Sequence, residues 1–151
     1  MAKPEKIVVL DFGGQYNQLI ARRVRESGVY CEILNYAVPI EQWRDESLRG
    51  IILTGGPNSV YAEGAPRMKE EILHLGVPVL GICYGMQLIN DLCGGRVESA
   101  EVREYGHTML CVTDSALFKG VQPETAVFMN HGDRVSVLPK GFTADASTAN
   151  C

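Results

Sequence analysis

Apolar and polar positions follow two different patterns along the chain, and the first of them runs through residues 6–92. Short runs rich in Val, Ile and Leu have the length of buried strands, at residues 6–12, 29–36, 50–54 and 77–82. Other segments carry apolar residues at helical spacing, at residues 15–27, 39–48, 66–75 and 86–92. Strand and helix therefore alternate, which predicts a parallel sheet flanked by helices.

For two of these elements, the sequence also predicts which side chains are buried. The run at residues 77–82 is expected to be a strand that is covered on both faces of the sheet. In the helix at residues 15–27, the apolar side chains Leu19, Ile20 and Val24 are expected to form the inward stripe.

The second pattern begins after residue 95, where no long helix is expected. Short strand-like segments follow one another at residues 96–100, 107–113, 125–129 and 134–138. They predict an antiparallel extension or a hairpin layer. Between the last two lies a polar cluster, Asn130-His-Gly-Asp133, which predicts a loop with donors, acceptors and exposed backbone for a ligand. A lone histidine such as His131 is more often structural or solvated than catalytic.

Glycine-containing turns follow three strands of the predicted parallel sheet: Asp11-Phe-Gly-Gly14, Thr54-Gly-Gly-Pro57 and Gly81-Ile-Cys-Tyr-Gly85. All three fall at the carboxyl ends of their strands, where ligands collect in such sheets. A Gly-Gly-Pro sequence is usually a plain turn. Beside a nucleophile on an adjacent strand, its glycines allow a backbone N–H to face the reacting atoms and stabilise an oxyanion.

Cys83 lies where a buried strand gives way to a helix, and it is bracketed by Gly81 and Gly85. This is the pattern of a nucleophile elbow, with Cys in place of the hydrolase Ser. Such a sharp turn forces the nucleophile into a strained backbone conformation. The N-terminus of the following helix stabilises the thiolate, which is the reactive form. An isolated Cys is more often a buried core thiol, but the two glycines favour a nucleophile here.

The composition is that of an ordinary globular protein, with 46% apolar and 21% charged residues. The 151 residues predict one domain that spans the whole chain. The net charge of −4 gives no electrostatic reason to expect nucleic acid or an anionic membrane as a partner. No apolar run is long enough to span a bilayer, and the N-terminus lacks the apolar core of a signal peptide.

The cysteines indicate a reducing environment. There are five, an odd number, and they are not spaced as zinc ligands with histidine: Cys31, Cys83, Cys93, Cys111 and Cys151. We therefore expect no metal site, no disulfide framework and a cytoplasmic location.

A resemblance to a known family is carried by five segments: Leu10-Asp-Phe-Gly-Gly-Gln-Tyr16, Ala21-Arg-Arg-Val-Arg-Glu26, Leu53-Thr-Gly-Gly-Pro57, Gly81-Ile-Cys-Tyr-Gly-Met-Gln87 and Asn130-His-Gly-Asp133. Together they resemble the class I glutamine amidotransferases, and the first, second and last are similar to the glutaminase domains of GMP synthases. The resemblance covers nearly the whole chain. It implies a single flavodoxin-like α/β domain over residues 1–151, with an open, mainly parallel sheet flanked by helices and a small antiparallel extension in the C-terminal third.

The resemblance also implies a chemistry. Cys83 would attack the side-chain amide carbon of glutamine and release ammonia, leaving a glutamyl thioester that water hydrolyses. The backbone N–H groups of Gly55 and Tyr84 would hold the oxyanion. The glutamine pocket would be lined by Gln87, Asn130, His131, Gly132 and Asp133. A synthetase domain or subunit of GMP synthase, with ATP and Mg, would use the ammonia to aminate XMP to GMP, and the glutaminase domain would need no cofactor.

One departure from the family concerns the general base. In the family this base is a His followed two positions later by a Glu, and the sequence contains no such pair. The chain ends at residues 146–151, where the family continues into the segment that bears the pair, and the synthetase domain is absent. We therefore expect a C-terminally incomplete domain with little or no activity of its own. An exposed sheet edge would allow it to form homo-oligomers.

Two other functions remain open at this stage. The chain could be the glutaminase of another class I amidotransferase, such as that of anthranilate or carbamoyl-phosphate synthesis, although its Asp11-Phe-Gly-Gly-Gln-Tyr16 start argues against this. It could also be a non-catalytic module that binds glutamine or a partner synthetase domain. The missing base favours this alternative, whereas the intact nucleophile elbow favours an enzyme.

Overall fold

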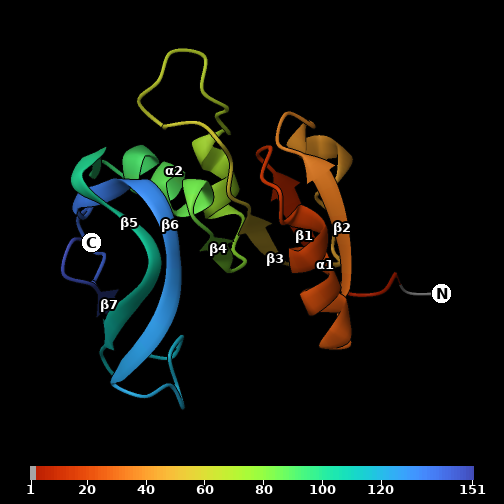
Figure 1. The fold of residues 1–151 in the computed structure, drawn as a ribbon. Helices are drawn as coiled ribbons and strands as arrows, with labels where there is room; N and C mark the ends of the chain where they lie inside the picture. Colours follow the sequence, from red (N-terminus) through yellow and green to blue (C-terminus); the bar gives the residue numbers. More distant parts are fainter. Residues whose placement is uncertain (1–2) are drawn as a thin grey trace. The chain divides into compact units, whose positions relative to one another are not determined.

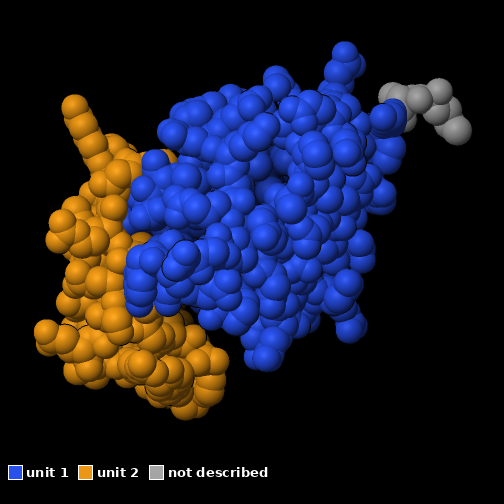
Figure 2. Space-filling model, turned by 90° about the horizontal axis from the view of Figure 1, so that it is seen from above, with its two compact units in different colours: residues 1–92 blue, residues 93–151 orange. Residues whose placement is uncertain are grey.

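The structure is a computed structural model that describes residues 3–151. The chain divides into two compact units, residues 1–92 and residues 93–151, which are coloured separately in Figure 2. Each unit has a sheet of its own. The sequence-based prediction of one domain over residues 1–151 stays a prediction.

The first unit is built on a four-stranded parallel sheet, as the alternation of strand and helix predicted (Figure 1). The strands, in the spatial order β2-β1-β3-β4, are β1 (Lys6–Asp11), β2 (Tyr30–Asn35), β3 (Leu48–Leu53) and β4 (Val79–Gly81). Because β1 and β3 are central, they supply the core with its most buried side chains, including Val8, Leu10 and Leu53. Burying each such side chain stabilises the fold by about 1.5–3 kcal/mol.

Two long helices flank this unit: α1 (Asn17–Glu26) and α2 (Tyr84–Leu92). In α1, Ile20 and Val24 pack against the core as predicted, but Leu19 is 47% exposed. Ala21 takes the central place and is fully buried beside Val9 of β1. The inward stripe of α1 therefore contains Ala21 in place of the predicted Leu19.

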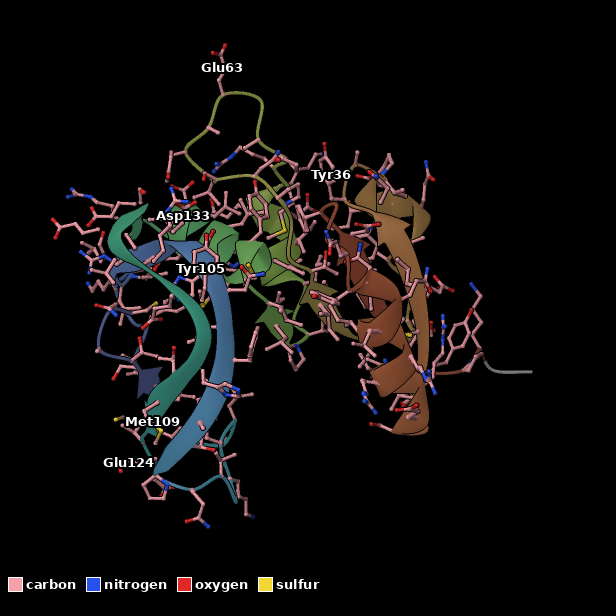
Figure 3. All side chains as sticks on the ribbon, viewed as in Figure 1. Tyr36, Glu63, Tyr105, Met109, Glu124 and Asp133 are labelled. Carbon is pink, nitrogen blue, oxygen red and sulfur yellow. The ribbon has the colours of Figure 1, made fainter. Side chains whose placement is uncertain are left out.

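The helices predicted at residues 39–48 and 66–75 are wrong in length, because each contains only a short 3-10 helix. These are η1 (Ile40–Gln42) and η2 (Glu70–His74). The Asp45 carboxylate accepts the Ser47 N–H at 3.0 Å, which turns the chain into β3 soon after η1. Before η2, the hydroxyl of Tyr84 donates to the carbonyl of Pro66. The loop that leads to η2 carries Glu63 at its tip (Figure 3).

Strand β4 differs from its prediction in burial. The sequence predicted a strand covered on both faces, but Leu80 is 42% exposed. The reason is topological: β4 pairs only with β3 and forms one edge of the four-stranded sheet.

The second unit is a three-stranded antiparallel sheet in the order β6-β5-β7, which confirms the predicted antiparallel extension. Its strands are β5 (Arg96–Val112), β6 (Glu124–Val137) and β7 (Ala146–Ser147). The four short strands predicted here are in fact two long ones, which form a hairpin that leaves Tyr105 and Met109 exposed (Figure 3). The long pairing, which has a register shift between Ser99 and Glu104, satisfies backbone groups that separate short strands would leave open. Residues 130–133 accordingly lie within β6, and the predicted loop is wrong.

Candidate active site

Cys83 sits in the turn between β4 and α2, and its backbone is strained. Its φ of 51° makes it the one non-glycine residue with positive φ in the described part of the chain. This left-handed conformation costs an L-residue about 1–2 kcal/mol, and such strain gathers at functional sites. The thiol is exposed. The strained and accessible turn predicted from the Gly-x-Cys-x-Gly pattern is therefore present, and the role of Cys83 as a nucleophile stays a prediction.

Both flanking glycines are required by close packing. A Cβ on Gly81 would lie 2.6 Å from the backbone nitrogen of Met86, and one on Gly85 would collide with the carbonyl oxygen of Leu53. This close approach brings β3 and the first turn of α2 together. The Gly85 N–H donates to the carbonyl of Thr54 at 3.1 Å, and the Ile82 N–H donates to that of Leu53 at 2.9 Å. The turn is thus tied to the end of β3 on both sides of Cys83.

The Gly-Gly-Pro turn after β3 borders the nucleophile. A Cβ on Gly55 would lie 3.3 Å from the Cβ of Cys83 and 3.9 Å from its Sγ. Tyr84 is the first residue of α2, so its backbone N–H has no acceptor inside the helix. The structure therefore brings Gly55 and Tyr84 next to Cys83. Their action as oxyanion donors stays a prediction.

The side chains of Tyr84 and Gln87 are buried rather than exposed to a ligand. Tyr84 donates its hydroxyl to the carbonyl of Pro66. Burial raises the pKa of Tyr84 above its ordinary value, so this hydroxyl keeps its proton and stays a donor at neutral pH. Gln87 is held on α2, where its N–H donates to the carbonyl of Cys83 at 3.1 Å. The predicted contact of Gln87 with substrate stays a prediction.

Sequence reasoning missed an aromatic stack beneath the turns. The ring of Phe12 lies 5.3 Å from that of Tyr36 and 5.6 Å from that of Tyr84, between ring centroids. Tyr36 follows β2 and is labelled in Figure 3. The stack joins the ends of β1 and β2 to α2. Its only signal in the sequence was an aromatic residue at the end of each of the first two strands.

In the second unit, His131 is engaged within its own sheet. Its Nε2 lies 2.8 Å from a carboxylate oxygen of Glu104, and its Nδ1 lies 3.0 Å from the carbonyl oxygen of Asp133. The His131 side chain is 14% exposed and that of Glu104 is 4% exposed. The other members of the predicted substrate loop are spread along β6: Asn130 is exposed opposite Tyr105, Gly132 packs beside Arg103, and Asp133 is half-buried.

Glu104 was also missed by sequence reasoning, although it gathers several donors. Besides His131, the hydroxyl of Thr148 donates to it at 2.7 Å and the amide of Asn150 at 3.3 Å. Burial raises the pKa of Glu104, but these hydrogen bonds outweigh it and hold the pKa below its usual range. The carboxylate therefore stays ionised and joins β5, β6 and the segment after β7.

Other candidate groups are less organised. His74 is exposed and lies 3.6 Å from Glu70. Among residues 3–151, no group of three or more His, Cys, Asp or Glu side chains is arranged to hold a metal ion. Within the described residues of the first unit, no hydrogen-bond partner contacts the thiol of Cys83. No helix in residues 3–151 has the length and apolar character needed to cross a membrane.

Comparison with known proteins decides the family. The model of the family described as glutamine amidotransferase class-I matches residues 8–151. The chain belongs to the class I glutamine amidotransferases. The match extends over both compact units, and it confirms the resemblance inferred from the sequence motifs.

The most similar relatives include two bacterial proteins named GMP synthase [glutamine-hydrolyzing]. The one from Lachnospira eligens is 55% identical over 148 residues, which are 97% of this chain and 28% of that protein. The one from Clostridium tetani is 52% identical over 150 residues, which are 99% of this chain and 29% of that protein. The chain therefore spans less than a third of the length of these relatives.

Solved structures share the fold. A protein from Thermoplasma acidophilum, described as a GMP synthase subunit, is 32% identical, with a TM-score of 0.80 over all of this chain and 76% of that one. A glutamine amidotransferase from Thermotoga maritima has a TM-score of 0.75 at 21% identity, over 99% of this chain and 69% of that one, and supports the fold alone. These neighbours confirm the predicted open, mainly parallel sheet with an antiparallel extension.

Proposed function

We propose that this chain carries the nucleophile of a glutaminase that supplies ammonia to a GMP synthase. One observation carries the proposal: Cys83 is held with positive φ at the start of α2, with Gly55 packed against it. This arrangement presents a thiolate to a carbonyl carbon and offers backbone N–H groups to the oxygen.

That geometry supports a reaction in two stages, formation of a thioester and its hydrolysis. The Cys83 thiolate attacks the side-chain amide carbon of glutamine, and the C=O electron pair moves to the oxygen. The N–H groups of Gly55 and Tyr84 stabilise this oxyanion, because fixed donors in a site cost no reorganisation as charge develops. The C–N bond then breaks, the nitrogen takes a proton and ammonia leaves. Water hydrolyses the glutamyl thioester to glutamate and regenerates the thiol.

The second half of the proposal concerns where the ammonia goes. Proteins named glutamine-hydrolysing GMP synthases share 52–55% identity with nearly all of this chain, which supports the same pathway here. In this proposal a synthetase domain or subunit binds ATP and Mg and uses the ammonia to aminate XMP, whereas residues 1–151 need no cofactor. The odd number of cysteines supports a cytoplasmic location as part of this proposal.

A glutamine-like alkylating agent tests the glutaminase function. We expect 6-diazo-5-oxo-L-norleucine to modify Cys83 with a rate that saturates in reagent, and glutamine to protect against it. Glutamate at the same concentration serves as the matched control and is expected to protect less. The readout is the mass of the peptide that contains Cys83. Modification that glutamine leaves unchanged would contradict a glutamine site at this cysteine.

A further inference from the structure

Thr54 is a fully buried polar residue between two turns of the candidate site. It follows β3, and its side chain is 0% exposed. The Phe12 N–H, at the end of β1, donates to its hydroxyl oxygen at 3.0 Å, and the hydroxyl donates its own proton to the carbonyl of Gly55 at 3.0 Å. A hydroxyl has one proton to donate and two lone pairs to accept with, so it satisfies both bonds at once. Valine fits the same volume but makes neither bond.

Beside the Thr54 hydroxyl, the backbones of the two turns approach each other closely at glycines. A Cβ on Gly14 would lie 2.5 Å from the carbonyl oxygen of Gly55, and one on Gly56 would collide with the carbonyl oxygen of Phe12. The carbonyl of Gly55 is therefore held on the side of β1 by the Thr54 hydroxyl and by close packing. Rotation of this peptide would take the acceptor away from the buried hydroxyl.

The direction of the Gly55 carbonyl also fixes the direction of the Gly56 N–H, because both belong to one planar peptide. The peptide between Gly55 and Gly56 is trans, so its C=O and N–H point in opposite directions. Because the carbonyl points toward β1, the trans geometry directs the Gly56 N–H to the opposite side of β3, which is the side on which β4 pairs. Thr54 thus sets the orientation of the Gly56 N–H, a backbone donor that adjoins the Gly55 N–H of the proposed reaction.

We propose that Thr54 is a positioning residue for the oxyanion site, because its hydroxyl holds the Gly55–Gly56 peptide in the orientation that serves the reaction at Cys83. The inference rests on the proposed function, in which a carbonyl oxygen gains charge beside this turn. Thr54 does not touch the substrate, and it acts through the peptide that it fixes.

A comparison of two reactions of Cys83 isolates this role. With p-nitrophenyl acetate, the thiolate adds to the carbonyl carbon, the electron pair moves to the oxygen, and collapse of the oxyanion expels p-nitrophenolate and leaves an acetyl thioester. With iodoacetamide, the thiolate displaces iodide directly and no oxyanion forms. The ratio of the two rates, each corrected by subtracting the rate of Cys83→Ala, therefore reports the oxyanion site separately from the accessibility and ionisation of the thiol.

We expect Thr54→Val to lower the acylation-to-alkylation ratio by about tenfold or more, since loss of a whole oxyanion donor costs about 10²–10³ in rate. Thr54→Ala removes the hydroxyl as well and should act in the same direction, which covers the case in which the valine variant does not fold. Thr54→Ser keeps the hydroxyl and should stay within about threefold of the unmodified chain. Thr125→Val, in β6, is the matched control and should leave the ratio unchanged.

Two results would overturn the inference. If Thr54→Val and Thr54→Ala keep the ratio of the unmodified chain, or lose both rates equally, the hydroxyl is only a structural group. If Cys83 of the unmodified chain shows no higher ratio than the thiol of N-acetylcysteine, there is no oxyanion site to position, and the proposed function fails together with the inference. The first result leaves the proposed function standing, so the two failures are distinguishable.

Discussion

At the scale of single residues, the strained turn at Cys83 was predictable because its signal is local. Gly81, Cys83 and Gly85 lie within five positions, and the need for glycine follows from backbone atoms that any such turn brings together. Thr54 and Glu104 were not predictable, because their importance comes from partners that are distant in the sequence. The hydroxyl of Thr54 meets Phe12 across 42 positions, and Glu104 meets Thr148 across 44.

The strain at Cys83 predicts a stabilising substitution at the expense of function. Glycine adopts positive φ without penalty, so Cys83→Gly should unfold with a free energy about 1 kcal/mol higher than Cys83→Ala. Urea unfolding of the two variants measures the difference. A glycine variant no more stable than the alanine variant would mean that the turn carries no strain.

The packing of Gly85 predicts a much larger, destabilising effect. A Cβ there meets both the carbonyl and the side chain of Leu53, so Gly85→Ala should lower the free energy of unfolding by about 3 kcal/mol or more. Gly28→Ala is the matched control: Gly28 has positive φ but open space around its Cα, so only about 1 kcal/mol of backbone strain is expected. Equal losses for the two variants, from urea unfolding, would refute the close approach of α2 to β3.

At the scale of elements, the parallel sheet was predictable and the short helices were not. The strand runs are rich in Val, Ile and Leu and indicate strands clearly. Residues 39–48 and 66–75 show helical spacing that turns and side-chain contacts override. Residues 130–133 were expected to form a loop because they are polar. They remain in β6 because His131 finds Glu104 directly opposite it in the sheet.

Glu104 makes the second unit sensitive to acid. Its pKa is lowered in the folded state, so its contribution to stability is complete above the unfolded-state pKa of about 4.3 and is lost as the pH falls through the folded value. We expect Glu104→Gln to lower the stability of residues 93–151 at pH 7 and to remove this part of the acid dependence. Glu98→Gln is the control, because Glu98 lies in the same strand and has a more exposed ion pair to Arg134. It should change neither the stability of residues 93–151 at pH 7 nor its acid dependence. Hydrogen exchange of β5 and β6 amides, followed from pH 7 down through the range below about 4.3, gives both readouts.

At the scale of the whole molecule, the family match covers both compact units, but the sequence lacks the His and Glu pair that the family uses as its base. Its three histidines, His74, His107 and His131, are each followed two positions later by a residue other than Glu. We therefore expect the 151-residue chain, expressed alone, to release little or no ammonia from glutamine. The Lachnospira eligens relative, assayed beside it, is the positive control. Release at the rate of that relative, abolished by Cys83→Ala, would show that a base is present after all.

The reactivity of the Cys83 thiol is the sharpest test of an activated nucleophile in this turn. Iodoacetamide alkylation, followed site by site by peptide mass spectrometry, compares Cys83 with Cys111, which is also exposed but lies in β5. The position of Cys83 at the start of α2 predicts alkylation about fivefold faster or more, because a helix N-terminus stabilises the thiolate. Alkylation of Cys83 no faster than that of Cys111 or Cys93 would contradict that activation.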